Sequence, residues 1–286
     1  MCLVTDTKMQ KLSLQTHHII DLYFAVDNVL LEPPKPKGGR PPALRQSEVV
    51  TILVWNALTC PQQTLKAVYD STKLYHARDF PQLPRYNRFV DHCHRALPAL
   101  ILTLQSLLVT TAPIRLMDAT MLEVCKLARA DQHKTAKGVA DFGKNWQGWH
   151  YGFKLHASIN RQGQFCGLIF TPANIYDAQM MPAILNEYTK VAVGDGTYNA
   201  SKMRQKIARD YHCVVIAPVH PSQKKKIMAS WQHLLLLARP KIEAVFDYLK
   251  EHMGMVSSFP RSVNGYFLHY VRILLGYQIQ ALGQGV

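Results

Sequence analysis

The chain lacks the cysteine pairs that mark disulfide frameworks and structural zinc sites. Its six cysteines are scattered, and no two of them form a Cys-x-x-Cys pair. The string His92-Cys93-His94 contains metal-binding side chains, but neighbouring residues of a helix point apart, so we expect no metal site there. In a chain of 286 residues, this cysteine usage predicts a reduced, intracellular protein.

Long hydrophobic runs are also missing. The longest apolar stretch, Leu97–Val109, is too short to cross a bilayer and contains several polar side chains. The segment Met1–Lys11 has no apolar core of the kind that a signal peptide requires. We therefore expect a soluble, cytoplasmic protein that has no membrane partner.

Acidic residues are scarce. The sequence has 19 Asp and Glu against 33 Lys and Arg, which gives a formal net charge of +14. The surplus is concentrated in residues 111–286, which hold 21 basic and 11 acidic side chains. Such a surplus predicts a polyanionic partner, most simply nucleic acid. A basic surface that serves only solubility is the alternative.

The first 110 residues have apolar side chains at helical spacing and no strand pattern. The segment Pro33–Pro42 cannot be helical, and it predicts either a hinge or an arm that lies along DNA phosphates. A helix, a break at Pro61 and a second short helix are weakly compatible with a helix-turn-helix. We predict an all-helical N-terminal region over residues 1–110, with helices at Leu12–Leu31, Ala43–Trp55, Thr64–Tyr69, Tyr86–Ala96 and Leu97–Leu108.

From Ala112 onward the pattern predicts three antiparallel strands followed by alternating helices and strands. This order is that of a ribonuclease-H-like (retroviral-integrase-like) catalytic domain, an α+β or α/β fold with helices on both faces of the sheet. We expect that domain over residues 111–286. The predicted strands are Ile114–Met117 with its extension Leu122–Val124, Trp149–Ile159, Phe165–Thr171, Val191–Asp195 and Val214–Ala217. The predicted helices are Asn174–Tyr188, Ser201–Asp210, Ile242–His252 and Tyr266–Leu282, and Lys126–Trp149 is predicted to be a basic loop.

Three acids follow strands or lie on a helix of this region. Asp118 is expected to end the first strand, Asp195 the fourth, and Glu243 to begin a late helix. In the ribonuclease-H-like arrangement the first and fourth strands are neighbours, so their acids would face each other. Hard divalent cations prefer oxygen ligands, and two of them about 4 Å apart can serve phosphoryl transfer. Taken alone, the Gly194-Asp195-Gly196 string is also a common turn.

The helix around Glu243 carries an R-x3-E-x6-K spacing. Arg239, Glu243 and Lys250 are separated by one and then about two helical turns, which predicts one shared face. Arg239 would keep Glu243 ionised, and Lys250 would reach a DNA phosphate. An ordinary amphipathic helix with an Arg–Glu pair is the alternative.

Several strings, in this order along the chain, resemble DDE transposases of bacterial insertion sequences, and are most similar to the branch numbered nine-eighty-two. The most distinctive is Gly148-Trp149-His150-Tyr151-Gly152-Phe153-Lys154-Leu155-His156. The others are Tyr86-Asn87-Arg88-Phe89-Val90, Ala96-Leu97-Pro98-Ala99-Leu100, Asp118-Ala119-Thr120, Val124-Cys125, Gln132-His133-Lys134, Lys137-Gly138, Thr171-Pro172-Ala173-Asn174, Asp177, Gly194-Asp195 with Tyr198, and the R-x3-E-x6-K helix.

The resemblance implies that Asp118, Asp195 and Glu243 are the catalytic residues and the ligands of Mg²⁺ or Mn²⁺, with two ions. It implies cleavage and joining of double-stranded DNA, at transposon ends and target, by a homo-oligomer in the bacterial cytoplasm, associated with the nucleoid. The residues expected to contact DNA are Arg239, Lys250, Lys126, Arg129, Lys134, Lys137, Lys154, Lys202, Arg204, Lys206 and Lys224–Lys226.

Two departures from the family pattern stand out: Gly196 occupies the place of a usual lysine, and Leu236 that of a usual tyrosine. Two alternatives therefore stay open, a metal-dependent nuclease that joins no strands and a decayed copy that only binds DNA. Lesser candidates for the site are the acids Asp177 and Glu123 and the histidines His150 and His156.

Overall fold

The computed structural model describes residues 18–31, 42–145, 148–218, 228–256 and 260–283. The chain divides into two compact units. One, which we call the helical unit, combines Met1–Leu107 with Leu249–Val286, and the other, the sheet unit, is Leu108–Tyr248. Most of the predicted Pro33–Pro42 arm and all of Lys224–Lys226 lie outside the described residues. The functional boundaries at 1–110 and 111–286 stay a prediction.

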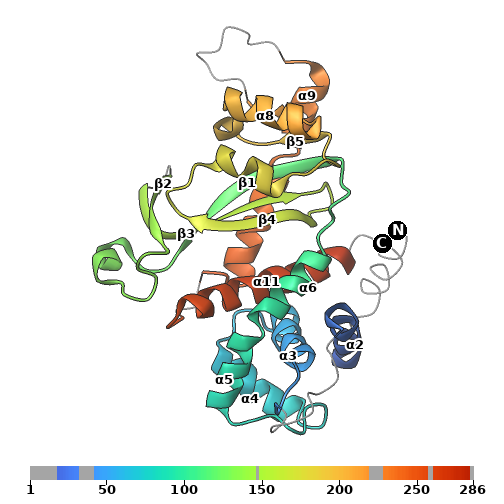
Figure 1. Ribbon diagram of the computed structural model, residues 1–286, viewed down its shortest axis with the longest axis vertical. Helices are drawn as coiled ribbons and strands as arrows, with labels where there is room; N and C mark the ends of the chain where they lie inside the picture. Colours follow the sequence, from blue (N-terminus) through green and yellow to red (C-terminus); the bar gives the residue numbers. More distant parts are fainter. Residues whose placement is uncertain (1–17, 32–41, 146–147, 219–227, 257–259, 284–286) are drawn as a thin grey trace. The chain divides into compact units, whose positions relative to one another are not determined.

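Helices predicted from apolar spacing make up the N-terminal part of the helical unit (Figure 1). The C-terminal helix α11 (Val263–Gly283) joins them and packs against α3 and α6. Gly276 lets α11 approach closely, because a Cβ there would stand 2.8 Å from the Cβ of Ala57. The other helices of this unit are α2 (Ile19–Leu30), α3 (Gln46–Thr59), α4 (Leu65–Tyr75), α5 (Tyr86–Arg95) and α6 (Leu97–Ser106).

A six-stranded mixed sheet forms the centre of the sheet unit, in the order β2-β3-β1-β5-β6, with β4 paired to β3. Strand β3 runs antiparallel to β1, β2 and β4, whereas β1, β5 and β6 are parallel. The unit is therefore mixed α+β, and the parallel part brings the carboxyl ends of β5 and β6 to one edge. The strands are β1 (Ile114–Glu123), β2 (Asp141–Asn145), β3 (Gly148–Ile159), β4 (Phe165–Pro172), β5 (Val191–Val193) and β6 (Val214–Ile216).

Helices pack against this sheet. A core cluster that includes Met117, Met181 and Ile207 joins β1 to α7 and α8, while α10 packs against β1. None of the helices in the described part of the chain is long and apolar enough to cross a membrane. The helical segments of this unit are η1 (Leu127–Gln132), η2 (Asp177–Met180), α7 (Met181–Ile184), η3 (Gly196–Tyr198), α8 (Ser201–Tyr211), α9 (Ser230–Leu236) and α10 (Pro240–Asp247). The π-helical η4 (Tyr248–His252) follows α10, and all of it after Tyr248 belongs to the helical unit.

Two predicted elements of the sheet unit are wrong. The predicted helix Asn174–Tyr188 is reduced to η2 and α7, which ends at Ile184. The buried guanidinium of Arg115 donates to Ile184 O at 3.2 Å and to Asn186 Oδ1 at 2.7 Å, so that this carbonyl group bonds a side chain and not the N–H of a further helical turn. The predicted basic loop contains β2, whose composition gives little strand signal. Its Gly143 lies so close to Ala173 that a Cβ would stand 2.4 Å from the carbonyl oxygen.

Candidate active site

The register of two parallel strands brings Asp118 and Asp195 to the same level. In the last residue pair between β1 and β5, Leu116 lies beside Val193. Asp118 comes two residues after Leu116, and Asp195 comes two residues after Val193. The prediction that Asp118 ends its strand is wrong, because β1 continues along β3 to Glu123, beyond the point where β5 ends. The two strands are adjacent, as expected, so the acids flank the edge where open α/β sheets bind ligands.

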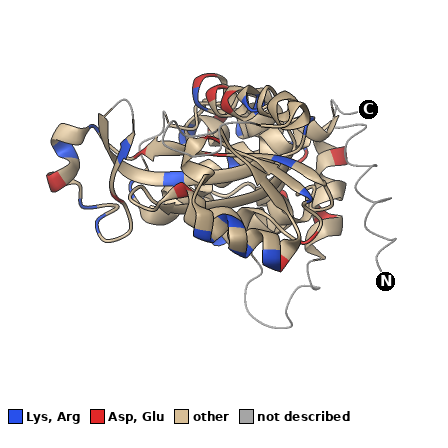
Figure 2. Cartoon of the chain, turned by 90° about the horizontal axis from the view of Figure 1, so that it is seen from above, with Lys and Arg blue, Asp and Glu red and all other residues tan. Residues whose placement is uncertain are grey.

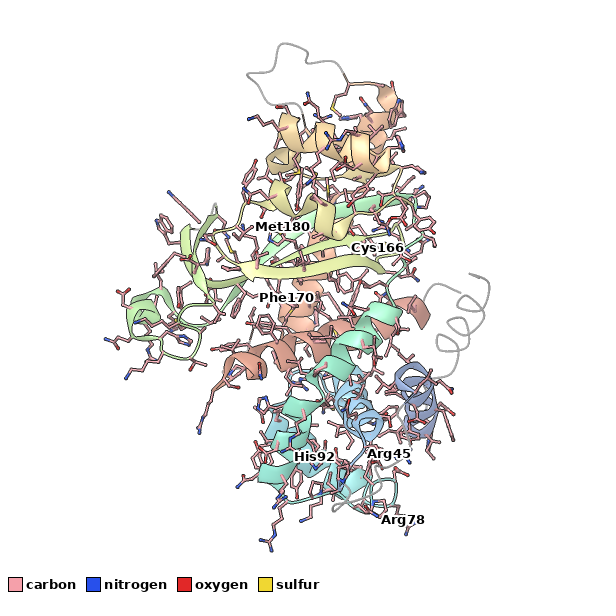
Figure 3. All side chains as sticks on the ribbon, in the orientation of Figure 1. Arg45, Arg78, His92, Cys166, Phe170 and Met180 are labelled. Atoms are coloured by element: carbon pink, nitrogen blue, oxygen red, sulfur yellow. The ribbon has the colours of Figure 1, made fainter. Side chains whose placement is uncertain are left out.

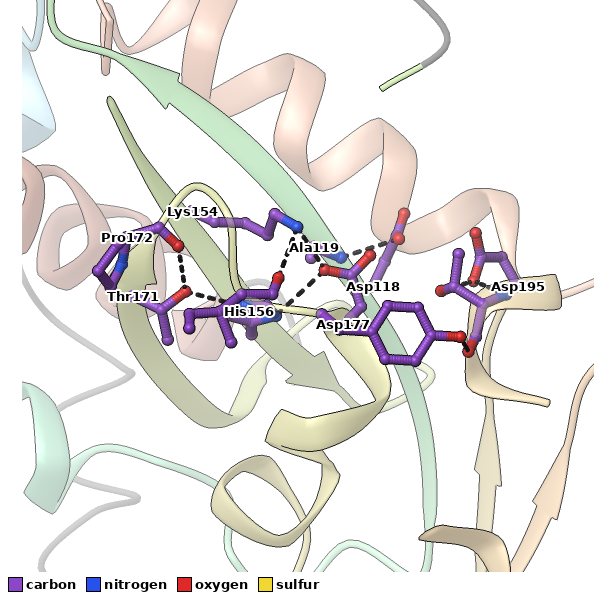
Figure 4. Close-up of polar contacts among 11 residues, drawn as sticks. Asp118, Ala119, Lys154, His156, Thr171, Pro172, Asp177 and Asp195 are labelled. Carbon is purple, nitrogen blue, oxygen red and sulfur yellow. Dashed lines mark hydrogen bonds and ion pairs between the residues drawn. The ribbon is translucent and has the colours of Figure 1, made fainter. Parts of the chain in front are cut away.

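Asp118 is a half-buried carboxylate with little compensation. Its Oδ1 accepts one hydrogen bond, 2.8 Å long, from the backbone N–H of Ala119 (Figure 4). Burial raises the pKa of Asp118 to about 7, and the nearby charges of Asp195 and Glu243 contribute to that rise, whereas Ala119 N–H and Arg239 oppose it. The structure therefore places Glu243 and Arg239 within electrostatic reach of Asp118.

Asp195 is held by the turn that follows it. Its Oδ1 accepts the backbone N–H of Thr197 at 2.9 Å and the Thr197 hydroxyl at 2.5 Å, which caps η3. Gly194 has no room for a side chain, because a Cβ would stand 2.5 Å from the ring of Tyr198. The Gly-Asp-Gly string is thus a turn, as the simpler interpretation expected, and it also fixes the direction of the carboxylate.

Glu243 lies in α10, the helix that packs against β1. Arg239 Nη2 is 2.7 Å from Glu243 Oε1, so the predicted pair one helical turn apart is confirmed. With exposed fractions of 27% and 43%, solvent weakens this pair, and its contribution to stability is small. Lys250 lies in the π-helical η4, beyond the α-helical spacing that predicted its position.

Lys154 was predicted to contact DNA, but its ammonium group is bonded to two acceptors of the protein itself. Its side chain is 12% exposed, and Nζ donates to Ile175 O at 2.8 Å and to Asp177 Oδ1 at 2.9 Å (Figure 4). Burial raises the pKa of Asp177, and the charge of Asp195 adds to that rise, while Lys154 opposes it. Asp177 thus lies within electrostatic reach of Asp195 and is paired with Lys154.

The two histidines of β3 lie in different surroundings. His156 is fully buried, with Nε2 2.9 Å from Thr171 Oγ1 and Nδ1 3.7 Å from Asp177 Oδ1. Burial, followed by the charge of Lys154, lowers the pKa of His156 to about 4, so the ring is neutral at physiological pH. His150 pairs with Glu123 through Nδ1 and with Asn145 Oδ1 through Nε2, at 2.8 Å.

Tyr198 completes the buried surroundings of the acids. Its hydroxyl has no hydrogen-bond partner among the described residues, although its side chain is fully buried. Burial raises the pKa of Tyr198, and the charges of Asp177, Asp118 and Asp195 add to that rise. The Tyr198 hydroxyl is therefore a buried polar atom within electrostatic reach of Asp177, Asp118 and Asp195.

The remaining basic residues divide into exposed and engaged ones. Arg204 is engaged, since its guanidinium donates to Asn199 Oδ1 at 2.6 Å and Val215 O at 2.9 Å. Several others are exposed along the connection that projects between β1 and β2 (Figure 2) or on α8. The exposed members of the predicted set are Lys126, Arg129, Lys134, Lys137, Lys202 and Lys206.

The donor set fits a hard cation in its chemistry. The carboxylates of Asp118, Asp195 and Glu243 make a local concentration of acidic groups in a basic chain, and burial and the two acidic neighbours raise the pKa of Asp118. As the side chains stand, no three His, Cys, Asp or Glu residues of the described ranges are grouped tightly enough to hold a metal ion. The carboxylates would have to close around an ion when it binds.

An acidic centre at the edge of a mixed sheet, with a helix that adds a third acid, defines a candidate enzyme active site. The model of the transposase DDE domain family matches residues 109–263, a range that contains all three acids. The chain therefore belongs to the transposase DDE domain family, whose members process nucleic acids. A comparison with curated proteins finds no match. The nine-eighty-two branch stays a prediction.

The sequence did not identify Tyr176, which hydrogen-bonds the turn that holds Asp195. Tyr176 Oη donates to Thr197 O at 2.6 Å, and this contact links the segment before η2 to the turn that holds Asp195. No periodicity or spacing signals such a contact, because 21 residues separate its partners. Figure 3 shows the described side chains on the ribbon, with Met180 of η2 labelled.

Proposed function

We propose that the protein is an insertion-sequence transposase that cleaves the DNA ends of its own element and joins them to a target. The family match supports the transposase assignment. The strand order β4-β3-β1-β5-β6, with β3 antiparallel and the last three strands parallel, supports a ribonuclease-H-like fold for the sheet unit.

The level placement of Asp118 and Asp195 on neighbouring parallel strands is the observation that carries this proposal. Glu243 adds the third acid from α10, and its charge acts on Asp118. We assign Asp118, Asp195 and Glu243 as the ligands of Mg²⁺ or Mn²⁺, with two ions. Such ions supply, when bound, an activated attacking oxygen and stabilisation of the leaving oxygen in phosphoryl transfer.

The side chains of the protein have separate roles in this proposal. Asp118, whose pKa is raised to about 7, would be about half protonated at pH 7, and a bound cation would favour its ionised form. Thr197 keeps the carboxylate of Asp195 oriented through two hydrogen bonds. Arg239 pairs with Glu243 and adds a positive charge where DNA phosphates would approach.

Exposed lysines and arginines would hold the DNA through its phosphates. The connection between β1 and β2 projects with Lys126, Arg129, Lys134 and Lys137 exposed, and α8 adds Lys202 and Lys206. Phosphate contacts position a duplex without reading its sequence. Joining two element ends to one target also requires that two active sites meet, so we propose a homo-oligomer on DNA.

The test uses purified protein and linear DNA that carries the ends of the element, either intact or precut to a free 3′-OH. With Mg²⁺ or Mn²⁺ we expect cleavage of the intact ends and joining of the precut ends to a plasmid, read by gel and by sequencing of the junctions. Cleavage without joined product would instead indicate a nuclease. Binding without either reaction would indicate a decayed copy.

A further inference from the structure

Three consecutive residues tie the centre of the sheet to the turn that carries Asp195. Ile175 O and Asp177 Oδ1 accept from Lys154 Nζ of β3, at 2.8 and 2.9 Å. Between them, Tyr176 donates its hydroxyl hydrogen to Thr197 O at 2.6 Å. The segment Ile175–Asp177 is thus anchored to β3 on one side and bonded to the turn after β5 on the other.

The turn passes this contact directly to the carboxylate. Thr197 accepts from Tyr176 through its carbonyl oxygen and donates to Asp195 Oδ1 through both its N–H and its hydroxyl. Displacement of Thr197 would therefore move both hydrogen bonds that orient Asp195. The Tyr176 hydroxyl is one residue removed from the acid and does not touch it.

The anchor works from the opposite face of the sheet to Asp118. Asp118 stands directly across from Ala157, so it shares a face with Ala157, whereas Lys154 is an odd number of residues away and points to the other face. Lys154 is also 12% exposed, and both of its acceptors belong to the protein. Its position suits a support beneath the site better than a contact with DNA.

We infer that Tyr176 is a positioning residue for Asp195, and that the Lys154–Asp177 ion pair anchors the segment from which Tyr176 acts. This inference rests on the proposed function, in which Asp195 is a metal ligand. Hydrogen-bonded partners that orient a ligand typically contribute about 10–100-fold to metal affinity or activity. Since Tyr176 is 48% exposed and water competes for its bond, we expect about tenfold, the lower end of that range.

The substitution Tyr176→Phe removes one hydroxyl and keeps the ring. Tyr188→Phe is the matched control, because Tyr188 is also 48% exposed but precedes β5, at the other end of that strand from Asp195. Mn²⁺ affinity of the DNA-free protein is measured by calorimetry, cleavage of element ends is measured as a function of Mn²⁺, and DNA affinity is measured without divalent ions.

For Tyr176→Phe we expect Mn²⁺ affinity about tenfold weaker, cleavage shifted to higher Mn²⁺ by a similar factor, and unchanged DNA affinity. Tyr188→Phe should match the wild type in all three. Equal Mn²⁺ affinity in the two variants would overturn the inference while leaving the proposed function intact. A loss of DNA affinity with unchanged Mn²⁺ affinity would make Tyr176 a DNA contact and would also overturn it. A wild type that neither binds Mn²⁺ nor cuts DNA would overturn the proposed function, and the inference with it.

Discussion

Arg272 of the helical unit and Asp118 of the sheet unit are compensated by the protein to very different degrees. In the helical unit, the guanidinium of Arg272 is 1% exposed and donates to Asn56 Oδ1, Gln63 O and His269 Nδ1 at 2.6–3.2 Å. In the sheet unit, the carboxylate of Asp118 accepts a single backbone N–H and lies near two more acids. Burial lowers the pKa of Arg272 to about 10, which leaves it charged, whereas it brings the pKa of Asp118 to about 7.

The difference separates structural charges from functional ones. A buried charge whose hydrogen-bonding capacity is filled by the protein holds the fold together and needs no further partner. Arg115 of the sheet unit is of this kind, since four backbone carbonyls and Asn186 accept from it. A buried acid that the protein leaves poorly compensated marks a place where a group from outside completes the electrostatics.

The largest expected effect comes from removing that acid. Asp118→Asn should reduce strand cleavage by several orders of magnitude while DNA affinity stays near that of the wild type, because metals supply most of the charge stabilisation in such reactions. Asp195→Asn and Glu243→Gln should behave alike. Each variant is assayed for cleavage and for DNA binding.

Glu123→Gln is the control for these acid variants. Glu123 lies on the same strand as Asp118, but it is an odd number of residues away, which places its side chain on the other face, and it is paired with His150, so cleavage should persist. If Glu243→Gln cleaves normally while Asp118→Asn is inactive, the third ligand is misassigned. Asp247, one helical turn further along α10, would then be the next candidate.

The opposite experiment removes a satisfied charge. Arg272→Met should lower the free energy of unfolding by roughly 2–4 kcal/mol, because each buried acceptor left without its donor costs about 1–3 kcal/mol. Urea denaturation followed by circular dichroism measures the change. Arg261→Met replaces an exposed arginine of the same unit and should cost less than about 0.5 kcal/mol. Equal costs would contradict the structural role of Arg272.

A third prediction concerns pH. The pKa of Asp118 is raised on folding, so the folded state binds more protons between about pH 4 and pH 7. The free energy of unfolding therefore decreases as pH rises through that window, by at most about 1.4 kcal/mol per pH unit. Urea midpoints of the wild type should fall relative to those of Asp118→Asn as pH rises to 8, and Mn²⁺ should restore part of the loss. Parallel profiles for the two proteins would contradict the raised pKa.

The smallest effect is expected from exposed charges, which neither unit buries. Lys137→Ala should weaken DNA binding about threefold and make the plot of log affinity against log salt shallower by about 0.9, because one phosphate contact is lost. Lys190 is equally an exposed lysine, but it lies before β5, at the far end of that strand from Asp195, so Lys190→Ala should leave the slope unchanged. Titrations at several salt concentrations measure both slopes. A change common to both variants would mean that the basic charge acts only collectively.

The adjacency of the strands that precede Asp195 and contain Asp118 was predictable from the order of the elements, whereas the role of the acids stays a prediction. Apolar runs are local signals that mark strands, and the alternation of helices with strands restricts the order of the sheet. The end of β1 was nevertheless misplaced, because the strand continues beyond Asp118 to Glu123. The Arg239–Glu243 pair was predictable because helical spacing is local.

Features that depend on distant partners could not be predicted. A lysine in a basic chain suggests an exposed DNA contact. Only the folded structure shows that Lys154 is paired with Asp177, 23 residues away in sequence. Strand β2 has weak propensity and is formed by pairing with β3. The predicted helix after Asn174 stops early because Arg115, 69 residues before Ile184, takes the carbonyl group of that residue.

The helical unit is built from two segments of the chain, one before and one after the sheet unit, and this has a consequence for biosynthesis. Chains are made from the N-terminus, so residues 108–248 leave the ribosome before α11 does. The sheet can pair its strands while α3 and α6 still expose the apolar surfaces that α11 will cover. A chain whose translation stops before Val263 would carry all three acids on a helical unit without its last helix, and chaperones or proteases would meet it first. Only a ribosome that reads through α11 releases a complete helical unit.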